Sequence, residues 1–369
     1  MRILCAVDGS ECSQWGVQAL EALASREPEA VTLLHVVDPS ALRAGRGGNP
    51  VAEKRALAAM EKAGGILLRE AERSARVALG QAATGPHTTL HRVLAHGPLA
   101  RTIVRRARQA KADLILIGSR GLSDIRGFLL GSVSRQIASI APCSVLVVKQ
   151  PLPRLTRVTL AVDDSKHSRA AARFLRSHIL PESATTTIFS SAERPVTDLA
   201  VRYLSKAQVE ELERPVIERA TRLVTTLRDE FLKEGFSVET DVQMDHVIDR
   251  IVKQVEARHA DLLVIGSREL TKSERRHLGS VSESVLRHAP CSVLVVRGRR
   301  ACPSGQRCTC TQAMTSKSPS RMRTPSRCVA SPSPRTAVWW ICCSPVPRHS
   351  RSPHGTPTTA SRRRCELPR

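Results

Sequence analysis

The sequence predicts an α/β protein with two tandem open parallel five-stranded sheets, each with helices on both faces. Internal repetition is the first observation: ADLILIGSR at 112–120 returns as ADLLVIGSR at 260–268, and APCSVLVV occurs unchanged at 141–148 and 289–296. Within each copy, short continuous apolar runs alternate with helical patterns. Such runs are typical of strands that are buried on both faces and joined by crossover helices.

The first copy shows each expected element in order. Its strands are expected at 2–7, 31–37, 88–93, 114–117 and 143–148, and its helices near 11–25, 51–79, 98–110 and 132–140. The helix at 98–110 has the clearest signals, because Gly97 and Pro98 begin it. Its expected buried stripe is Leu99, Ile103, Val104 and Ala107, and its arginines are expected to face water.

The second copy repeats this plan. Its strands are expected near 157–162, 185–189, 236–242, 262–265 and 291–296. The strand at 236–242 alternates apolar and polar residues, so one side of it should meet solvent. We expect domains at 1–150 and 154–298, followed by a tail at 299–369.

The tail differs in composition from both copies. Ten of the 22 prolines and seven of the eleven cysteines lie after residue 300. A segment rich in proline and serine with few aliphatic residues predicts disorder. Translation of a shifted reading frame would give the same residues. Cys302, Cys308 and Cys310 lack a C-x2-C pair, so we expect no metal there.

The charge of the chain does not indicate a nucleic-acid-binding body. The formal charge is +23, but residues 301–369 hold 12 basic residues and one acid, Glu366. The tail has few aromatic residues beyond Trp339 and Trp340, so nucleic acid is not an expected partner. No apolar run approaches the roughly 18 residues of a membrane helix. Asp8 follows the apolar start too early for a signal peptide, and we expect a cytoplasmic protein with reduced cysteines and no membrane contact.

Ligands of open parallel sheets bind beyond the carboxyl ends of the strands, so the residues there are the candidates. Asp8-Gly9-Ser10 follows the first strand and Gly118-Ser119-Arg120-Gly121 follows the fourth. Gly131-Ser132 begins a helix whose free N–H groups suit an anion. Glycines after strands are also common in simple turns, and Asp8 alone is equally well explained as a helix N-cap.

The order and spacing of these glycines resemble a known family. Gly118, Gly121 and Gly131-Ser132 fit G-x2-G-x9-G-[ST], the pattern of the universal stress protein (UspA) family in its tandem two-domain form. The resemblance extends over about residues 1–298 and includes Leu34-His35-Val36-Val37 and both PCSVLVV segments.

The resemblance implies a Rossmann-like fold related to the adenine-nucleotide α-hydrolases, with ATP, with or without Mg²⁺, across the strand ends. The implied nucleotide-binding residues are Asp8, Val36, Gly118, Arg120, Gly121, Gly131, Ser132, Val133 and Ser134. Family members commonly pair their last strands, so 143–148 and 291–296 should meet in an internal pseudo-dimer, and a homodimer is a further expectation. His35 is expected to be a packed or surface residue because nothing in the sequence supplies it with a nucleophile.

The second copy departs from the pattern. Gly266 and Gly279-Ser280 keep their places, but Glu269 replaces the middle glycine, which predicts phosphate repulsion and strain if the position needs a left-handed backbone. Phe189-Ser190-Ser191 is aligned here with His35-Val36-Val37. The second copy is therefore interpreted as degenerate.

Three function classes follow from these observations. The leading hypothesis is a nucleotide-dependent stress-response regulator with at most slow ATP hydrolysis, because no general base or phosphate-neutralising lysine occurs in the loop. An interaction module that binds no nucleotide is the alternative. An adenylylating enzyme is disfavoured because the Ser-Gly-Gly-x-Asp-Ser loop is missing.

Overall fold

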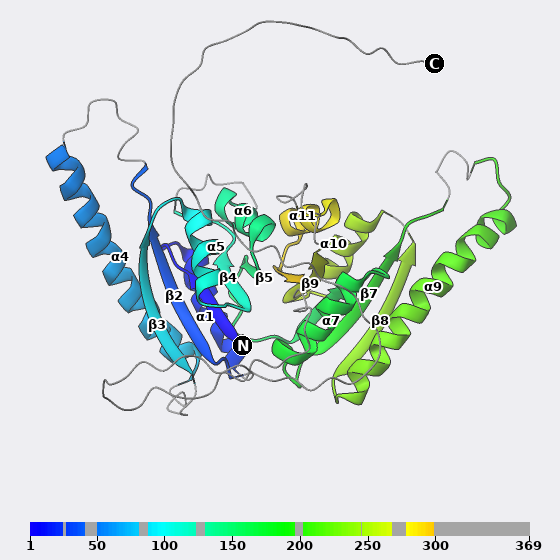
Figure 1. The fold of residues 1–369 in the computed structure, drawn as a ribbon. Helices are drawn as coiled ribbons and strands as arrows, with labels where there is room; N and C mark the ends of the chain where they lie inside the picture. The colour runs from blue at the N-terminus through cyan, green and yellow to red at the C-terminus, as the bar shows by residue number, and fades with distance from the viewer. Residues whose placement is uncertain are drawn as a thin grey trace, which may run out of the picture. The chain divides into compact units, whose positions relative to one another are not determined.

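The computed structural model describes residues 1–24, 27–40, 50–80, 88–122, 130–195, 202–244, 246–267 and 278–298. The expected disordered tail and Glu269 lie outside these residues. The elements up to residue 298 belong to one compact unit (Figure 1).

The first half contains the five expected strands. They are β1 (Arg2–Ala6), β2 (Ala30–Val37), β3 (Thr89–His96), β4 (Leu114–Gly118) and β5 (Ser144–Val148). Its helices are α1 (Glu11–Gln18), α2 (Leu20–Ala24), α4 (Pro50–Ala78), α5 (Leu99–Gln109) and α6 (Ser132–Ile140). The single helix expected over 11–25 is divided at Ala19 into α1 and α2.

The second half follows the same order. Its strands are β6 (Arg157–Ala161), β7 (Thr185–Ala192), β8 (Ser237–Met244), β9 (Leu262–Ser267) and β10 (Ser292–Arg297). Its helices are α7 (Lys166–His178), α9 (Lys206–Lys233), α10 (Val247–Ala257) and α11 (Ser280–His288). The two halves therefore share one architecture, as the repeat predicted.

The ten strands form one continuous sheet in the order β3-β2-β1-β4-β5-β10-β9-β6-β7-β8. Neighbours within each half are parallel, and β5 and β10 pair antiparallel with Leu146 opposite Leu294. This confirms the expected pairing of the last strands. The two expected five-stranded sheets are joined across it, because each apolar edge strand covers the other.

Two cations secure this junction reciprocally. Lys149 Nζ donates to the carbonyl of Ala289 at the end of α11 at 2.6 Å. Arg297 Nη2 donates to the carbonyls of Ala138 and Ser139 at the end of α6, each at 2.6 Å. Each half thus supplies a cation to the carbonyl end of a helix in the other half, where the helix dipole favours positive charge. Burial at this junction lowers the pKa of Lys149 to about 8.

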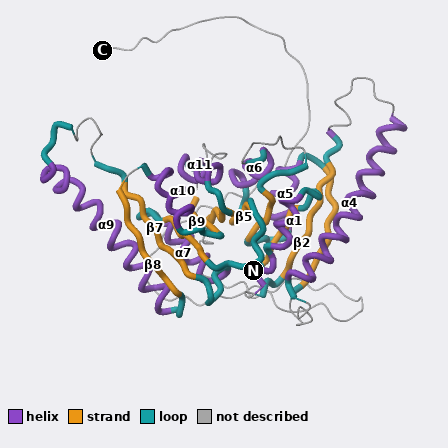
Figure 2. Tube along the Cα trace, turned by 180° about the vertical axis from the view of Figure 1, so that it is seen from behind, coloured by secondary structure: helices purple, strands orange, loops and turns teal. Residues whose placement is uncertain are grey.

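Helices cover both faces of the sheet (Figure 2). Alternate strand residues point to opposite faces. One face buries α1, α2, α4, α7 and α9 against residues such as Cys5 and Leu146. The other buries α5, α6, α10 and α11 against residues such as Leu4 and Val145. Burial raises the pKa of the Cys5 thiol to about 12, so this cysteine is a core residue.

The register of the sheet corrects the alignment of the two second strands. Ala6 pairs with Leu34, and its counterpart Ala161 pairs with Phe189. Phe189 therefore corresponds to Leu34, whereas the expected alignment placed it opposite His35 and was wrong by one residue. Over the last four residues of the two strands, no residue is identical to its counterpart, so that stretch offered no anchor for the alignment.

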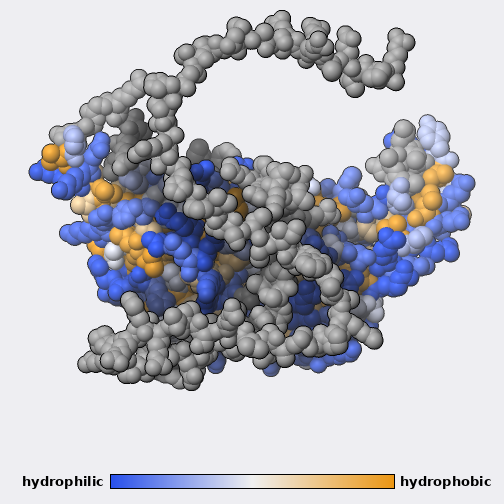
Figure 3. Space-filling view, in the orientation of Figure 1, coloured by the Kyte–Doolittle hydropathy of each residue, from blue (hydrophilic) through white to orange (hydrophobic). Residues whose placement is uncertain are grey.

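The visible surface of the described residues is mostly hydrophilic, with apolar residues mixed into it (Figure 3). Exposed apolar side chains on α4 and α9 include Ile66 and Leu212. Single exposed apolar side chains of this kind are normal for a folded protein. None of the helices that the structure describes is both long and apolar enough to cross a membrane.

Candidate functional site

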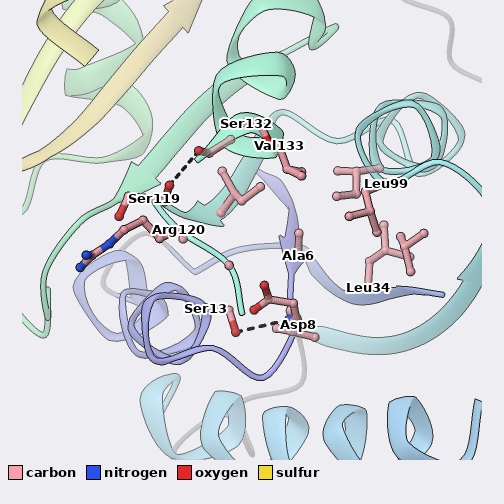
Figure 4. A pocket seen from close by; sticks show the side chains of 16 residues that line it. Ala6, Asp8, Ser13, Leu34, Leu99, Ser119, Arg120, Ser132 and Val133 are labelled. Carbon is pink, nitrogen blue, oxygen red and sulfur yellow. Dashed lines mark hydrogen bonds between the residues drawn. The ribbon is translucent and has the colours of Figure 1, made fainter. Parts of the chain in front are cut away.

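A pocket lies at the carboxyl ends of β1 and β4, where the strand order reverses in the first half (Figure 4). Eight of the nine predicted residues line it: Asp8, Val36, Gly118, Arg120, Gly121, Ser132, Val133 and Ser134. The ninth, Gly131, begins α6 beside it. The pocket encloses about 100 Å³, or about 660 Å³ with its open mouth. Small-molecule sites usually hold about 300–1,000 Å³, so a nucleotide would extend into the mouth.

Asp8 braces the start of α1. Its Oδ1 accepts from the backbone N–H of Ser10 at 2.9 Å and from the Ser10 hydroxyl at 2.6 Å. Ser10 is the helix N-cap, because its Oγ accepts from the N–H of Ser13 at 3.2 Å. The interpretation of Asp8 itself as the N-cap is thus wrong. The Asp8 carboxylate instead holds Ser10, which caps the helix, and Asp8 also lines the pocket.

The N-terminus of α6 presents backbone donors to the pocket. Gly131 is the N-cap and makes no side-chain capping bond. The N–H groups of the first helical residues have no intrahelical partner, and here these are Ser132, Val133 and Ser134, all of which line the pocket. The positive end of the helix dipole adds to their attraction for an anion.

Two of the predicted residues also have purely structural contacts. The Ser134 hydroxyl is buried and lies 2.9 Å from the carbonyls of both Ser119 and Gly131, so it holds the loop and α6 together. A Cβ on Gly118 would lie 2.6 Å from the carbonyl carbon of Cys12, so glycine is needed here for α1 to approach β4. Both contacts lie within the protein itself.

Arg120 and Gly121 line the pocket, as predicted. The Arg120 side chain is exposed and extends away from the apolar side chains of Leu34 and Leu99 (Figure 4). Positive φ angles among the described glycines occur at Gly9, Gly80, Gly97 and Gly235. The strain argument for Glu269, which assumed a left-handed backbone at the Gly121 position, therefore gains no support.

Apolar side chains form the remaining wall of the pocket, and they were not predicted from the sequence as site residues. Leu34, Leu99, Ile103 and Ile117 line this wall. Leu99 was expected in the buried stripe of its helix but is 38% exposed at the pocket. It is the first residue of α5, directly after the chain leaves the edge strand β3. Helical spacing alone does not distinguish a pocket wall from a core.

His35 is a packed residue, as expected. Its Nδ1 lies 2.8 Å from the carbonyl oxygen of Val7, which only accepts, so Nδ1 carries the proton. The imidazole also lies against Gly64 of α4, where an added Cβ would come within 2.6 Å of it. His35 is not among the residues that line the pocket.

The second half keeps the aspartate–serine contacts at the start of its first helix but differs in the apolar residue that corresponds to Leu34. Asp163 accepts from the hydroxyls of Ser165 and Ser168, and Ser165 caps α7 as Ser10 caps α1. Gly266 makes the same close approach to α7 that Gly118 makes to α1. In contrast, the larger Phe189 stands in the place of Leu34, and both side chains are buried.

Comparisons with known proteins agree with this architecture. The model of the Universal stress protein family matches residues 1–149 and again 155–297. Universal stress protein Rv1996 of Mycobacterium tuberculosis is 26% identical over 317 residues, covering 80% of this chain and 94% of the relative. Universal stress protein YxiE of Bacillus subtilis is 28% identical over 163 residues, which is 40% of this chain and 98% of the relative.

One solved structure shows the same fold over both halves. The universal stress protein from Archaeoglobus fulgidus superposes with a TM-score of 0.59 and 19% identity, covering 81% of this chain and 98% of its own. The fold of both halves is thus one that this chain shares with such proteins, and the family model matches each half separately. The chain belongs to the universal stress protein family, as a tandem of two family domains.

Proposed function

We propose that the first half binds one adenine nucleotide, ATP in the first instance, and that the chain acts as a nucleotide-dependent regulator of a stress response in the cytoplasm. The observation that carries this proposal is the convergence of the uncapped N-terminus of α6 with an apolar wall in one pocket. The N–H groups of residues 132–134 suit phosphate, and the wall suits a planar base.

The polar contacts of the pocket support binding more than catalysis. Among the described residues that line it, Asp8 is the one carboxylate, and it is engaged by Ser10. His35 donates to the backbone carbonyl of Val7, and its own side chain is not among those that line the pocket. A general base for an attacking water must lie within hydrogen-bond reach of it in the bound state. We therefore propose at most slow ATP hydrolysis.

Nucleotide binding is proposed for the first half alone. Phe189 is bulkier than Leu34, which lines the pocket of the first half, and it occupies the corresponding place in the second half. Glu269 adds a carboxylate to the second loop, which would repel a phosphate by about 1–4 kcal/mol per charge pair. Both changes oppose a second bound nucleotide.

The test is nucleotide analysis of the purified protein, followed by calorimetric titration with ATP. Gly131→Glu places a carboxylate at the N-terminus of α6, and it should abolish binding of about one ATP per chain. Gly279→Glu is the matched control, because a side chain on Gly279 meets no atom within 4 Å and its φ of −57° suits any residue. It should leave ATP binding unchanged.

Two outcomes would contradict the proposal. Two equivalent ATP molecules per chain would show that the second half is not degenerate. If the unaltered protein binds no adenine nucleotide, the alternative of an interaction module without a nucleotide holds. The ligand-independent roles of Ser134 and Gly118 are consistent with that alternative.

A further inference from the structure

A second hollow lies at the opposite end of the first-half strands and between the two halves. Residues at the end of α5, before β5, along α7 and at the end of β10 line it. It encloses about 570 Å³, against about 100 Å³ for the pocket at the carboxyl ends. This volume is within the range of about 300–1,000 Å³ that small-molecule sites occupy. We call it the junction groove.

The junction groove is strongly cationic. Its cations are Arg108, Lys111, Arg173 and Arg297, and its one carboxylate is Asp113. The Asp113 carboxylate accepts from the backbone N–H of Arg2 at 2.8 Å. Arg108, Lys111 and Arg173 form no ion pair with any residue that the structure describes, and all three are exposed. Their charges are therefore not neutralised by neighbouring described carboxylates.

The second half contains a similar hollow with the opposite charge balance. This twin groove encloses about 460 Å³ and is lined by Cys291 and Asp261, the counterparts of Cys143 and Asp113. Glu256 stands in the place of Arg108, and His259 in the place of Lys111. Arg157 is its one lysine or arginine among the described lining residues.

The helix dipole does not account for this difference. Cations near the end of α5 would be favoured by the carbonyl end of any helix. The corresponding helix α10 has no basic residue in its last turn. Arg173 lies within α7 and not at its carboxyl end. The positive charge is therefore a property of this one groove, contributed by separate elements of both halves.

Lys111 is held there in an unfavourable backbone conformation. Its φ is +50°, in the left-handed region that follows a helix end and that favours glycine. The N–H of Ala112 donates to the carbonyl of Ala107 at 2.9 Å, which closes the end of α5 around it. His259 has the equivalent conformation, with φ +47°. Glycine would suit both positions better for stability, so a change of Lys111 to glycine removes its charge without adding backbone strain.

We propose that the junction groove binds a small molecule with at least two negative charges, supplied by phosphate or carboxylate groups. Four cations from both halves line it, of which Arg297 also bonds the end of α6, and Phe174 in its lining offers an apolar contact for the carbon part of such a ligand. This site is separate from the nucleotide pocket. A ligand there contacts β10 and α7 of one half and α5 of the other, and it would stabilise their junction.

The test is calorimetric titration of the full chain with inorganic pyrophosphate. All proteins carry Gly131→Glu, so the nucleotide pocket does not contribute. Lys111→Gly should weaken pyrophosphate binding about five-fold, because it removes the attraction between the ammonium group and one phosphate charge about 4 Å away in an aqueous environment. Its melting temperature should be equal or higher, because glycine relieves the backbone strain. The paired change Arg108→Gln with Arg173→Gln should weaken binding further.

His259→Gly is the matched control in the twin groove. It relieves the same strain and should leave pyrophosphate affinity unchanged. Equal affinity in the Lys111→Gly protein and its parent would overturn the proposal, as would equal weakening by His259→Gly. Citrate that competes with pyrophosphate would identify carboxylates as ligands, and failure to compete would restrict the ligand to phosphates. Tighter binding of a polyglutamate peptide than of either small anion would overturn the assignment to a small molecule.

Discussion

Gly118→Ala tests the close approach of β4 and α1 on which the first pocket depends. The added Cβ would lie 2.6 Å from the Cys12 carbonyl carbon and 2.8 Å from the Ser13 backbone nitrogen. Both are backbone atoms, so α1 must move. Such overpacking costs about 1–3 kcal/mol, and alanine recovers about 0.4–1 kcal/mol by restricting the unfolded chain. We expect a net loss of about 1–2 kcal/mol in the free energy of unfolding.

Gly266→Ala is the matched variant in the second half. Its Cβ would lie 2.6 Å from the carbonyl carbon and oxygen of His167, so the loss of stability should be similar. The Ser13 hydroxyl lies 3.3 Å from the backbone nitrogen of Asp8, so a shift of α1 in the Gly118→Ala protein also displaces the pocket. Only that variant should weaken ATP binding, by about five-fold or more for each 1 kcal/mol of lost contact.

Urea unfolding and ATP calorimetry on both variants separate these effects. If Gly118→Ala is as stable as the unaltered protein, the close packing of α1 on β4 does not limit this position. If both variants weaken ATP binding equally, the nucleotide site is not confined to the first half. Only the predicted pair of results supports the asymmetric pocket.

Three further changes have defined outcomes. Ser10→Ala removes the cap bond to Ser13 and should lower the free energy of unfolding by about 1 kcal/mol in urea titrations. Arg297→Ala leaves the carbonyls at the end of α6 without their cation and should lower the melting temperature, whereas exposed Arg101→Ala should not. Lys149 has its pKa lowered from 10.5 to about 8, so the folded state loses this proton before the unfolded state does. Its contribution to stability therefore rises between about pH 8 and 10.5, and Lys149→Met should remove that part of the pH dependence, measured as the difference between the two proteins in urea titrations.

Part of this structure follows from the sequence because the relevant signals are local. A strand buried on both faces must be a continuous apolar run, and 114–117 and its repeat at 262–265 show it directly. The glycines at 118 and 131 mark the ends of a strand and the start of a helix, so the edge of the sheet that carries the pocket was predictable. The pairing of β5 with β10 was expected from two identical apolar segments that each needed cover.

Other features depend on contacts between residues far apart in the chain, and only the tertiary structure decided them. The register that places Phe189 opposite Ala161 is set by strand pairing and not by either strand alone. Leu99 has helical spacing for the core, yet it lines the pocket because of where α5 leaves the sheet edge. The junction groove collects its charges from α5, α7 and β10, which have no common sequence pattern. Two halves with the same architecture thus acquire different surfaces, because charge and shape at a junction are properties of the assembled chain.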